Sequence, residues 1–320
     1  MDLDILLPFH NADNFFWDAL NSLKKIRGVK ANIVLIDDRQ DNYKNLDFSF
    51  LKNVEYVRTT GGVGYGEALR IGSTHLSSEV VALFNSDDLV DPSRFIKQIN
   101  ELSTSEVNHC AIQRITKSGK IIRSLTGNFS SNYYDPILLL LGSYGANATW
   151  CMRRDWWDRN AFFDSEDCLD WRIALRAFHQ TKISYIHEPL YFYRKHPHQV
   201  TSNRNISPLK LQNVYLEWSA LSKTYEIPES DYSVFSTLAL PWQRYKVINL
   251  SETKLIAEHI YKIAQNIDID LAINMQALIY RRYLLALRQR TGFVNKVKLI
   301  ALGRKEIFNF LEDILTQVQK

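Results

Sequence analysis

The chain has 320 residues, of which 46% are hydrophobic and 23% charged, with a net charge of +4 at pH 7. This composition is typical of a soluble globular protein with a sizeable core. The charge is too small to predict nucleic-acid binding, and no apolar run approaches the roughly 18 to 20 residues that cross a membrane. A basic, apolar leader is absent from the first residues, so we expect a cytoplasmic protein.

Short apolar runs alternate with segments of helical spacing along the first 100 residues. We predict strands at 4–7, 32–36, 54–57 and 80–84, and helices at 15–25 and 69–76. Strands that alternate with helices in this way imply crossover connections and an α/β fold with a mostly parallel central sheet flanked by helices. We expect further strands at 110–115, 149–152 and 183–186, and helices at 209–223, 252–266 and 271–290.

Polar residues follow each of the first four predicted strands. They are Pro8 to Asn11, Asp37 with Asp38, the glycine-rich stretch 59–72, and Asn85 to Asp88. Parallel strands bring their carboxyl ends to one edge of the sheet, where ligands of such folds bind. The sequence therefore predicts one binding site at this edge.

The acidic turn after the fourth strand is the most informative of these clusters. Carboxylates at the end of a buried strand are costly unless they hold a positive partner. Hard oxygen ligands suit Mg²⁺ or Mn²⁺, which use one or two carboxylates beside a substrate phosphate. The alternative is a solvated turn in which Pro92 starts a helix.

Five segments occur in the order and approximate spacing of a known family. They are PFHN (8–11), LIDDRQDN (35–42), FNSDD (84–88), residues 170–176 and YRKHPHQVT (193–201). Over residues 1–201 the chain resembles the family 2 glycosyltransferases. The resemblance implies a GT-A fold and an inverting, metal-dependent transfer from a nucleotide-diphosphate sugar, with a UDP-sugar as donor. A glycan or lipid-linked hydroxyl in bacterial-type surface polysaccharide synthesis is the implied acceptor.

The resemblance for the first part of the chain, and the helical spacing for the rest, predict the domain organisation. Residues 1–205 would form the GT-A catalytic domain, with a nucleotide-binding half (1–100) and an acceptor-binding half (101–205). A helical C-terminal region would follow at 206–320.

The resemblance also assigns roles to individual residues. Asp38, with Asp37 beside it, would receive the base of the nucleotide, and a carboxylate is suited to an N–H donor on a base edge. Asp88 and His196 would hold Mn²⁺ or Mg²⁺, and Asp87 would lie near the ribose. The nucleotide-sugar contacts implied in full are Pro8, Phe9, Asn11, Asp37, Asp38, Gly62, Arg70, Asn85, Asp87 and Arg194.

The chain departs from the family pattern at Asn85, at the pair Leu69 and Arg70, and at Leu169, which replaces the usual Glu before Asp170. Asn85 replaces the first acid of the DxD metal motif, which removes one charge and predicts a weaker metal site. Leu69 and Arg70 replace the usual Arg-Asn pair after the glycine-rich loop, although Arg70 could still face a diphosphate.

Two aspartates compete for the role of general base. Asp167 completes a literal Glu-Asp pair, whereas counting back from Arg176 and the strand at 183 selects Asp170. We favour Asp170, because it opens a helical segment that can pack on the sheet and direct the carboxylate toward the cleft. A first-turn acid without a catalytic task is the structural alternative.

Two other functions are weighed against this one. A sugar nucleotidyltransferase should carry a basic loop after the first strand, where PFHN has no Lys or Arg. A nucleotide-sugar-binding protein without catalysis would explain Asn85 and Leu169.

Other features have less specific interpretations. One of Trp150, Trp156, Trp157 and Trp171 is expected to stack on a sugar, and Arg153 or Arg154 could meet an acidic acceptor. Eight basic residues and no acid lie between Leu271 and Lys305, which favours peripheral contact with the inner membrane face, a solvated helix or a dimer contact.

Overall fold

The protein is described by a computed structural model that covers residues 1–40, 46–122, 136–142, 146–160, 168–197, 199, 208–228, 250–266, 272, 275 and 279. The chain divides into two compact units. The first comprises Met1–Asn128, Asn132–Tyr134 and Ser143–Glu217, and the second comprises Phe129–Ser131, Asp135–Gly142 and Trp218–Lys320.

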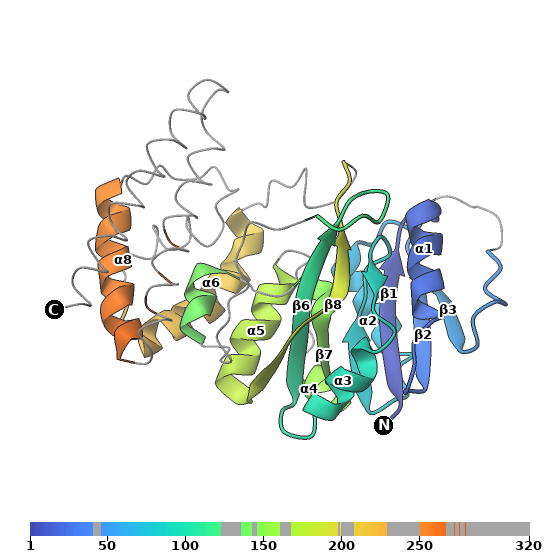
Figure 1. Ribbon diagram of the computed structural model, residues 1–320, viewed down its shortest axis with the longest axis horizontal. Coiled ribbons are helices and arrows are strands. Elements are labelled where there is room, and N and C mark those ends of the chain that lie inside the picture. The colour runs from blue at the N-terminus through green and yellow to red at the C-terminus, as the bar shows by residue number, and fades with distance from the viewer. Residues whose placement is uncertain are drawn as a thin grey trace. The chain divides into compact units, whose positions relative to one another are not determined.

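Strands and helices alternate through the first unit, as the apolar pattern predicts (Figure 1). The strands are β1 (Leu3–Phe9), β2 (Ala31–Asp37), β3 (Val54–Arg58), β4 (Val80–Leu83), β5 (Leu89–Val90), β6 (Val107–Ile115), β7 (Trp150–Arg153) and β8 (Ile183–Arg194). The helices are α1 (Asn14–Leu23), α2 (Tyr65–Ser73), α3 (Arg94–Glu101), α4 (Arg154–Asn160), α5 (Leu169–Gln180), α6 (Pro208–Thr224) and α8 (Leu250–Gln265), with 3₁₀ turns η1 (Pro136–Leu141) and η2 (Asn147–Thr149).

The strands form one mixed sheet in the order β3-β2-β1-β4-β7-β6-β8-β5. Strands β1 to β4 pair in parallel, and β6 pairs in parallel with β8. Strand β7 is antiparallel to both β4 and β6, so β6 and β8 run in the same direction as β1 to β4. The predicted mostly parallel α/β sheet is confirmed, with β5 and β7 as the antiparallel exceptions.

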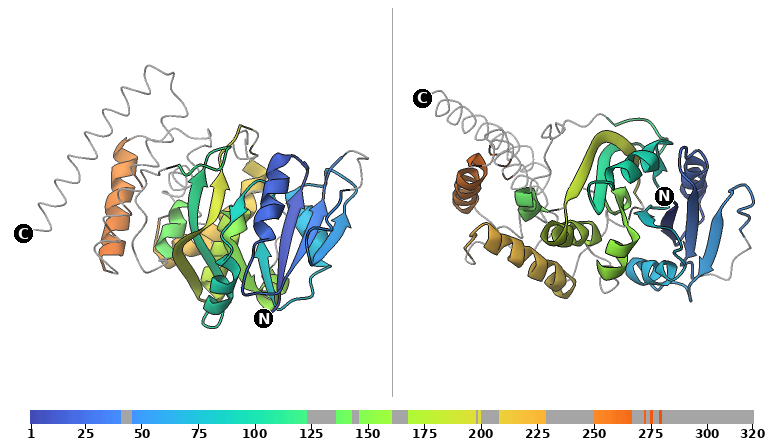
Figure 2. Two further views of the ribbon diagram at one scale, coloured as in Figure 1. Left: turned by 45° about the vertical axis from the view of Figure 1, so that its right-hand side comes forward. Right: turned by 90° about the horizontal axis from the view of Figure 1, so that it is seen from below.

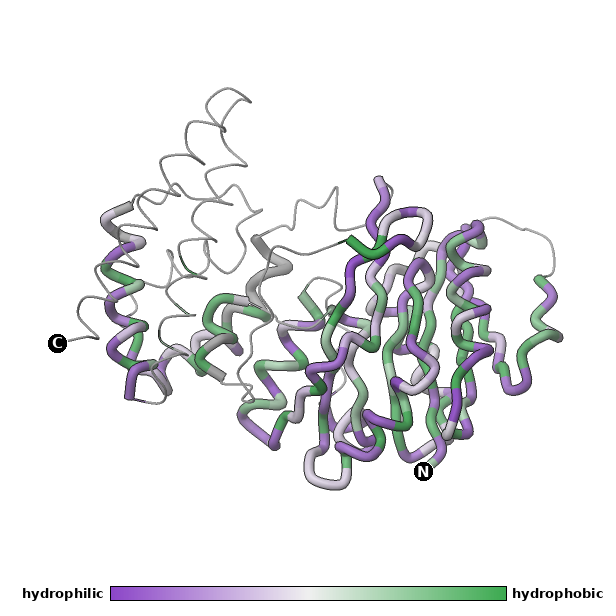
Figure 3. Tube along the Cα trace, viewed as in Figure 1, coloured by the Kyte–Doolittle hydropathy of each residue, from purple (hydrophilic) through white to green (hydrophobic). Residues whose placement is uncertain are grey.

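Alternate residues of the central strands serve the two faces of the sheet. Leu3, Ile5 and Leu7 belong to the same core cluster as the apolar faces of α1 and α3. Leu6 faces α2, where a Cβ on Gly72 would lie 2.2 Å from Ile36 Cδ1, so only glycine allows this close approach. Figure 2 shows α1 and α3 on one side of the strands and α2 and α4 on the other. The central strands are correspondingly hydrophobic along their length (Figure 3).

Among the boundaries that differ from the prediction, two affect the site. Helix α2 begins at Tyr65 rather than Leu69, because the buried Gly66 in its first turn does not break the helix. Strand β8 continues to Arg194 rather than ending at Ile186. Its pairing with β6 is irregular between Cys110 and Ile112, opposite the segment that contains Pro189, a residue that lacks a backbone N–H.

The tryptophans of the first unit belong to its interior. Trp150, Trp156, Trp157 and Trp171 are all buried, so none of them offers a face for sugar stacking in this structure. Trp157 Nε1 donates a hydrogen bond to Ser73 Oγ at 3.0 Å, which joins α4 to α2.

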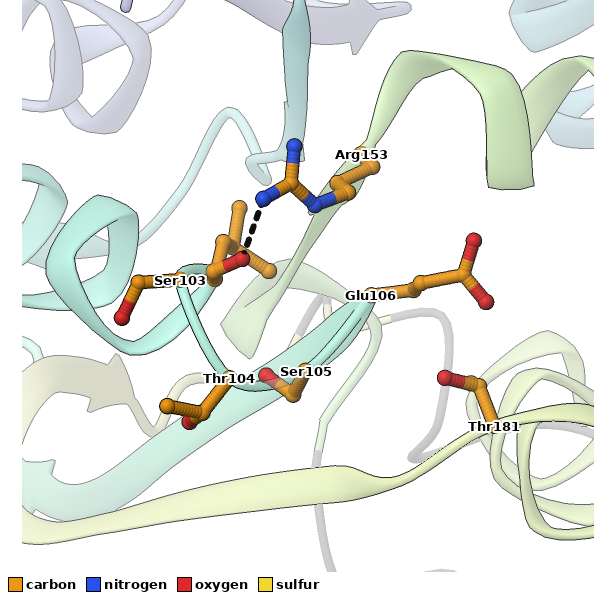
Figure 4. Close-up of a pocket in the computed structure, with 7 residues that line it drawn as sticks. Ser103, Thr104, Ser105, Glu106, Arg153 and Thr181 are labelled. Atoms are coloured by element: carbon orange, nitrogen blue, oxygen red, sulfur yellow. Dashed lines mark hydrogen bonds between the residues drawn. The ribbon is translucent and has the colours of Figure 1, made fainter.

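Arg153 and Arg154 lie at the amino edge of the parallel strands, away from the predicted site. Arg153 pairs with Val80, the first residue of β4, and its Nη2 donates to Leu102 O at 2.6 Å. It lines a hollow of about 230 Å³ together with Ser103, Ser105, Glu106 and Thr181 (Figure 4). The predicted role of these arginines at the acceptor side is therefore not supported by their position.

The second unit is helical where it is described. Helix α8 buries Ile256, Ala257 and Ile260, and Trp218 Nε1 donates to Leu140 O at 3.1 Å. The basic residues between Arg281 and Lys305 lie outside the described residues. Within the described part, no helix is both long and apolar enough to span a bilayer.

Candidate active site

The carboxyl ends of β1 to β4 meet at one edge of the sheet, as predicted. At this edge Asp37, the last residue of β2, is fully buried and paired with Arg39. Arg39 Nε and Nη2 bind the two carboxylate oxygens at 2.8 and 2.6 Å, a bidentate arrangement, and Tyr56 donates its hydroxyl from β3. Burial raises the pKa of Asp37, but the hydrogen bonds from Arg39 and Tyr56 outweigh it, so the pKa lies below its usual value.

This network predicts a loss of stability in acid. Because the folded-state pKa of Asp37 is lowered, its ionised form stabilises the fold above the unfolded-state pKa near 3.9, and this contribution disappears as the pH falls through the folded value. Urea unfolding of wild type and Asp37→Asn should differ by about 1 to 3 kcal/mol at pH 6 and by less at pH 3. The same difference at both pH values would contradict the assignment.

Asp38 holds the glycine-rich loop after β3. One carboxylate oxygen accepts from Thr59 Oγ1 at 2.6 Å and Val63 N at 2.9 Å, and the other accepts from Gly64 N at 3.0 Å. Gly61 has φ +89°, and a Cβ there would lie 2.7 Å from Arg39 O. A carboxylate has about four lone-pair positions, so three protein donors leave Asp38 room for one further hydrogen bond.

Replacing Asp38 by Asn should loosen this loop. The amide nitrogen of Asn cannot accept a hydrogen bond, so at least one of the loop donors loses its partner, at a cost of about 1 to 3 kcal/mol in unfolding free energy. Asp47→Asn is the matched control, because the exposed Asp47 accepts from a single backbone N–H, that of Ser49, and Asn can replace it there. Equal effects of the two substitutions in urea unfolding would show that Asp38 has no special anchoring role.

The two acids of the turn after β4 have different environments. Asp88 is fully buried, and its carboxylate accepts from Arg194 N at 2.7 Å, from Asn85 Nδ2 at 3.2 Å and from the Tyr191 hydroxyl. Burial and the neighbouring charge of Asp87 raise the pKa of Asp88 to about 7, although these hydrogen bonds partly oppose the shift. Burial and Asp88 also raise the pKa of Tyr191. Asp88 thus fastens the turn to β8.

Asp87 is the accessible acid of the pair. Its side chain is 30% exposed, and Oδ2 lies 3.0 Å from Nε2 of His196. His196 also packs against Phe15 at the start of α1, with ring centroids 4.8 Å apart and the ring planes tilted by 37°. Among the described residues, no three His, Cys, Asp or Glu side chains form a group that could hold a metal by themselves. Asp87 and His196 thus form one acid–imidazole pair at this point of the edge.

Arg194 is a buried side chain beside Asp87 that donates hydrogen bonds to three separate segments. Its Nε donates to Asp87 O at 2.9 Å, Nη1 to Lys117 O at 2.7 Å and Nη2 to Asp18 Oδ2 at 3.2 Å. The guanidinium lies 4.9 Å from the ring of Phe15. One side chain therefore ties together α1, the turn after β4 and the turn after β6. All three guanidinium nitrogens are engaged within the protein, so Arg194 serves first as a structural tie.

Most of the other predicted nucleotide contacts lie along the same edge, whereas Arg70 lies in the last turn of α2, which leads away from it. Pro8 and Phe9 are buried within β1, and Phe9 O accepts from Asp38 N at 2.8 Å. Asn11 is exposed after β1, and Gly62 N donates to Asp38 O at 2.9 Å. Arg70 is exposed and paired with Glu67 within α2.

Asp170 lies in the first turn of α5, as the sequence predicts. Since α5 leads into the start of β8, it runs against the strand direction and its first turn lies toward the carboxyl edge of the sheet. Cys168, two residues before Asp170, has φ +59°. This left-handed conformation is rare outside glycine and is often found near functional sites. Asp167 lies outside the described residues.

Several residues that shape the site could not be predicted from their sequence context. Tyr56 belongs to a predicted strand and Asp18 to a predicted helix, whereas Tyr191 lies beyond the strand predicted at 183–186. Arg39 could have been found, because an acid and an arginine two residues apart after a strand commonly form a local pair. The contacts of Tyr191 and Asp18 are long-range and have no local signal.

Comparison with known proteins identifies the family. Residues 4–158 match the family model for Glycosyl transferase family 2. The amino-terminal half of the chain belongs to this family. The predicted resemblance is thereby confirmed for these residues, while the segments at 170–176 and 193–201 lie beyond the match. No curated protein sequence matches the chain.

Solved structures extend the similarity in fold. S. aureus TarS 1-349 in complex with UDP-GlcNAc has a TM-score of 0.56 and 16% identity, over 97% of this chain and 92% of that one. The complex of the same protein with UDP has a TM-score of 0.54 and 15% identity, over 91% of both chains. At this identity the similarity shows a GT-A-like α/β fold, in which the mixed sheet confirms the predicted fold class.

Proposed function

We propose that the protein transfers a sugar from a nucleotide-diphosphate sugar, with a UDP-sugar as donor, to a hydroxyl of a glycan or lipid-linked acceptor. The observation that carries the proposal is the gathering of Asp38, the glycine-rich loop and the turn at Asn85–Asp88 at the carboxyl edge of one sheet. Ligands of such sheets bind there. The family match and the UDP-GlcNAc and UDP named for the TarS structures support this class of donor.

The nucleoside half of the donor would lie along β1 to β3. Asp38 has one lone-pair position left for an N–H of the base, and the buried Asp37–Arg39–Tyr56 network holds the strand ends rigid around it. Asn85 and the glycine-rich loop at Gly62 would face the ribose and diphosphate. Arg70 would reach a diphosphate only by leaving Glu67.

The ligand set at Asp87 fits a divalent metal that binds together with the nucleotide. Mg²⁺ or Mn²⁺ commonly uses one or two protein ligands and completes its shell with phosphate oxygens and water. We assign Asp87 and His196 to this task, and Asp88 to supporting the turn, because Asp88 is fully buried and already accepts three hydrogen bonds. When bound, such a cation neutralises the departing diphosphate.

Asp170 is proposed as the general base. In a single displacement it would take the proton of the acceptor hydroxyl, whose oxygen attacks the anomeric carbon opposite the diphosphate, so that the configuration inverts. Helix α5, which carries Asp170, is held in place by Arg176 and the buried Arg172, which bind Glu217 at 2.7 and 3.3 Å.

A thermal-shift panel of nucleotide sugars, with and without Mn²⁺, tests the proposal. We expect one or more UDP-sugars to raise the melting temperature, and more so with Mn²⁺, because ligands that bind only the folded state stabilise it. Nucleotide sugars that cause no shift under either condition would contradict the proposal. Stabilisation without turnover would favour a nucleotide-sugar-binding protein instead. A role in bacterial-type surface polysaccharide synthesis rests on the family and needs an identified acceptor.

A further inference from the structure

Four exposed basic side chains gather at the end of β6 and β8. Arg114 is in β6, Lys117 and Lys120 are in the hairpin turn that follows, and Lys195 follows β8. The turn is closed by a hydrogen bond from Thr116 N to Lys120 O at 2.8 Å, and Lys195 N donates to Ile115 O at 2.9 Å. We call these four residues the basic rim.

The charge of the basic rim is not neutralised by the protein. None of its four members forms an ion pair within the part of the chain that the structure describes, whereas Lys30, Lys97 and Arg159 each pair with an acid. Cations held close together without an acid repel each other, and an anion bound between them removes this cost.

The basic rim is attached to the candidate active site by Arg194. The same guanidinium that binds Asp87 O also binds Lys117 O, at 2.9 and 2.7 Å. Lys117 Nζ lies 5.9 Å from the ring centroid of Phe15, which in turn packs against His196. A ligand on the basic rim would therefore lie next to the Asp87–His196 pair.

We propose that the basic rim binds the acceptor, and that this acceptor is an anionic glycan chain carrying phosphodiester or carboxylate groups. The inference rests on the proposed function, whose acceptor it specifies. An acceptor chain must thread beside the donor, and the rim supplies cations at that point. A lipid surface is less well suited, because Ile121 is the one large exposed apolar side chain of the described hairpin and membrane binding needs a broader apolar face.

Binding of defined polymers by charge-reversed variants tests this proposal. The variant Lys117→Glu with Lys120→Glu is compared with Lys25→Glu with Lys52→Glu, which makes the same charge change on exposed lysines that follow α1 and precede β3, at the amino edge. The probes are poly(glycerol phosphate), polygalacturonate, neutral dextran and phosphatidylglycerol vesicles. We expect wild type to bind one or both anionic polymers and the rim variant to bind at least about tenfold more weakly, with the control close to wild type.

UDP binding with Mn²⁺ is measured on the same proteins, which separates the two proposals. If wild type binds UDP but neither polymer, the proposed role of the basic rim is wrong, while the proposed reaction is not contradicted. An equal loss of polymer binding in the control, a loss of UDP affinity in the rim variant, or binding to vesicles alone would each overturn it. Polymer binding through the rim by a protein that does not bind UDP would support the surface and contradict the proposed reaction.

Discussion

Replacing Asp170 by Asn is expected to lower kcat by a factor of about 10² to 10⁴, the usual contribution of a positioned general base. The amide cannot accept the proton of the acceptor hydroxyl, yet it has nearly the shape of the carboxylate. It can also keep the hydrogen bond that Asp170 Oδ1 accepts from Trp171 N at 2.9 Å. The fold and the affinity for the nucleotide should therefore survive. Steady-state kinetics with the identified donor and UDP titration with Mn²⁺ measure the two quantities separately.

Asp167→Asn is the matched control for this prediction. It removes a neighbouring acid of the same type, three residues earlier in the chain. We expect this variant to keep most of its activity. Full activity of Asp170→Asn together with inactive Asp167→Asn would transfer the role of general base to Asp167. A loss of UDP affinity in Asp170→Asn would instead indicate a role in donor binding.

Replacing the two acids of the turn after β4 one at a time should change the Mn²⁺-dependent affinity for UDP by very different amounts. Asp87→Asn removes the accessible carboxylate beside His196 and should weaken Mn²⁺-dependent UDP binding by at least about tenfold. Asp88→Asn should change it by less than about threefold, which is well under 1 kcal/mol. A buried carboxyl with a pKa raised to about 7 is already partly protonated at neutral pH, and Asn imitates that form.

The contacts of Asp88 explain why Asn is tolerated there. The amide oxygen can accept from Arg194 N, and the amide nitrogen can donate to the hydroxyl oxygen of Tyr191 once the Asn85 amide, which donates to the same position, turns its oxygen toward it. Titration calorimetry of UDP at several Mn²⁺ concentrations distinguishes the variants. If Asp88→Asn abolished the effect of Mn²⁺ while Asp87→Asn preserved it, Asp88 would be the metal ligand, as the sequence alone suggests.

The placement of the site at the carboxyl edge could be predicted because the necessary signals are local. Each of the first four strands is a short apolar run that ends in polar residues, and the alternation with helices sets their common direction. The first turn of α5 was likewise visible, since Asp170 precedes a helical apolar pattern. Signals of this kind depend on residues within one element and its flanks.

The difference in burial between Asp87, which is accessible, and Asp88, which is fully buried, could not be predicted from the sequence. It depends on Tyr191, which lies 103 residues along the chain from Asp88, and on β8 continuing past Pro189 to Arg194. A Glu-Pro pair is a common strand end, whereas here the pairing with β6 becomes irregular and then resumes. The role of Arg194 as a tie between three segments is hidden for the same reason, because all of its side-chain partners are distant in sequence.

The central claim is that the carboxyl edge cleaves a nucleotide-diphosphate sugar with a metal beside Asp87. Release of UDP from the UDP-sugar that gives the largest thermal shift tests it most directly, with Mn²⁺ or with EDTA, in wild type and Asp87→Asn. We predict UDP release by wild type with Mn²⁺, and its loss both in EDTA and in the variant. UDP release that is unaffected by EDTA and by Asp87→Asn would contradict the account.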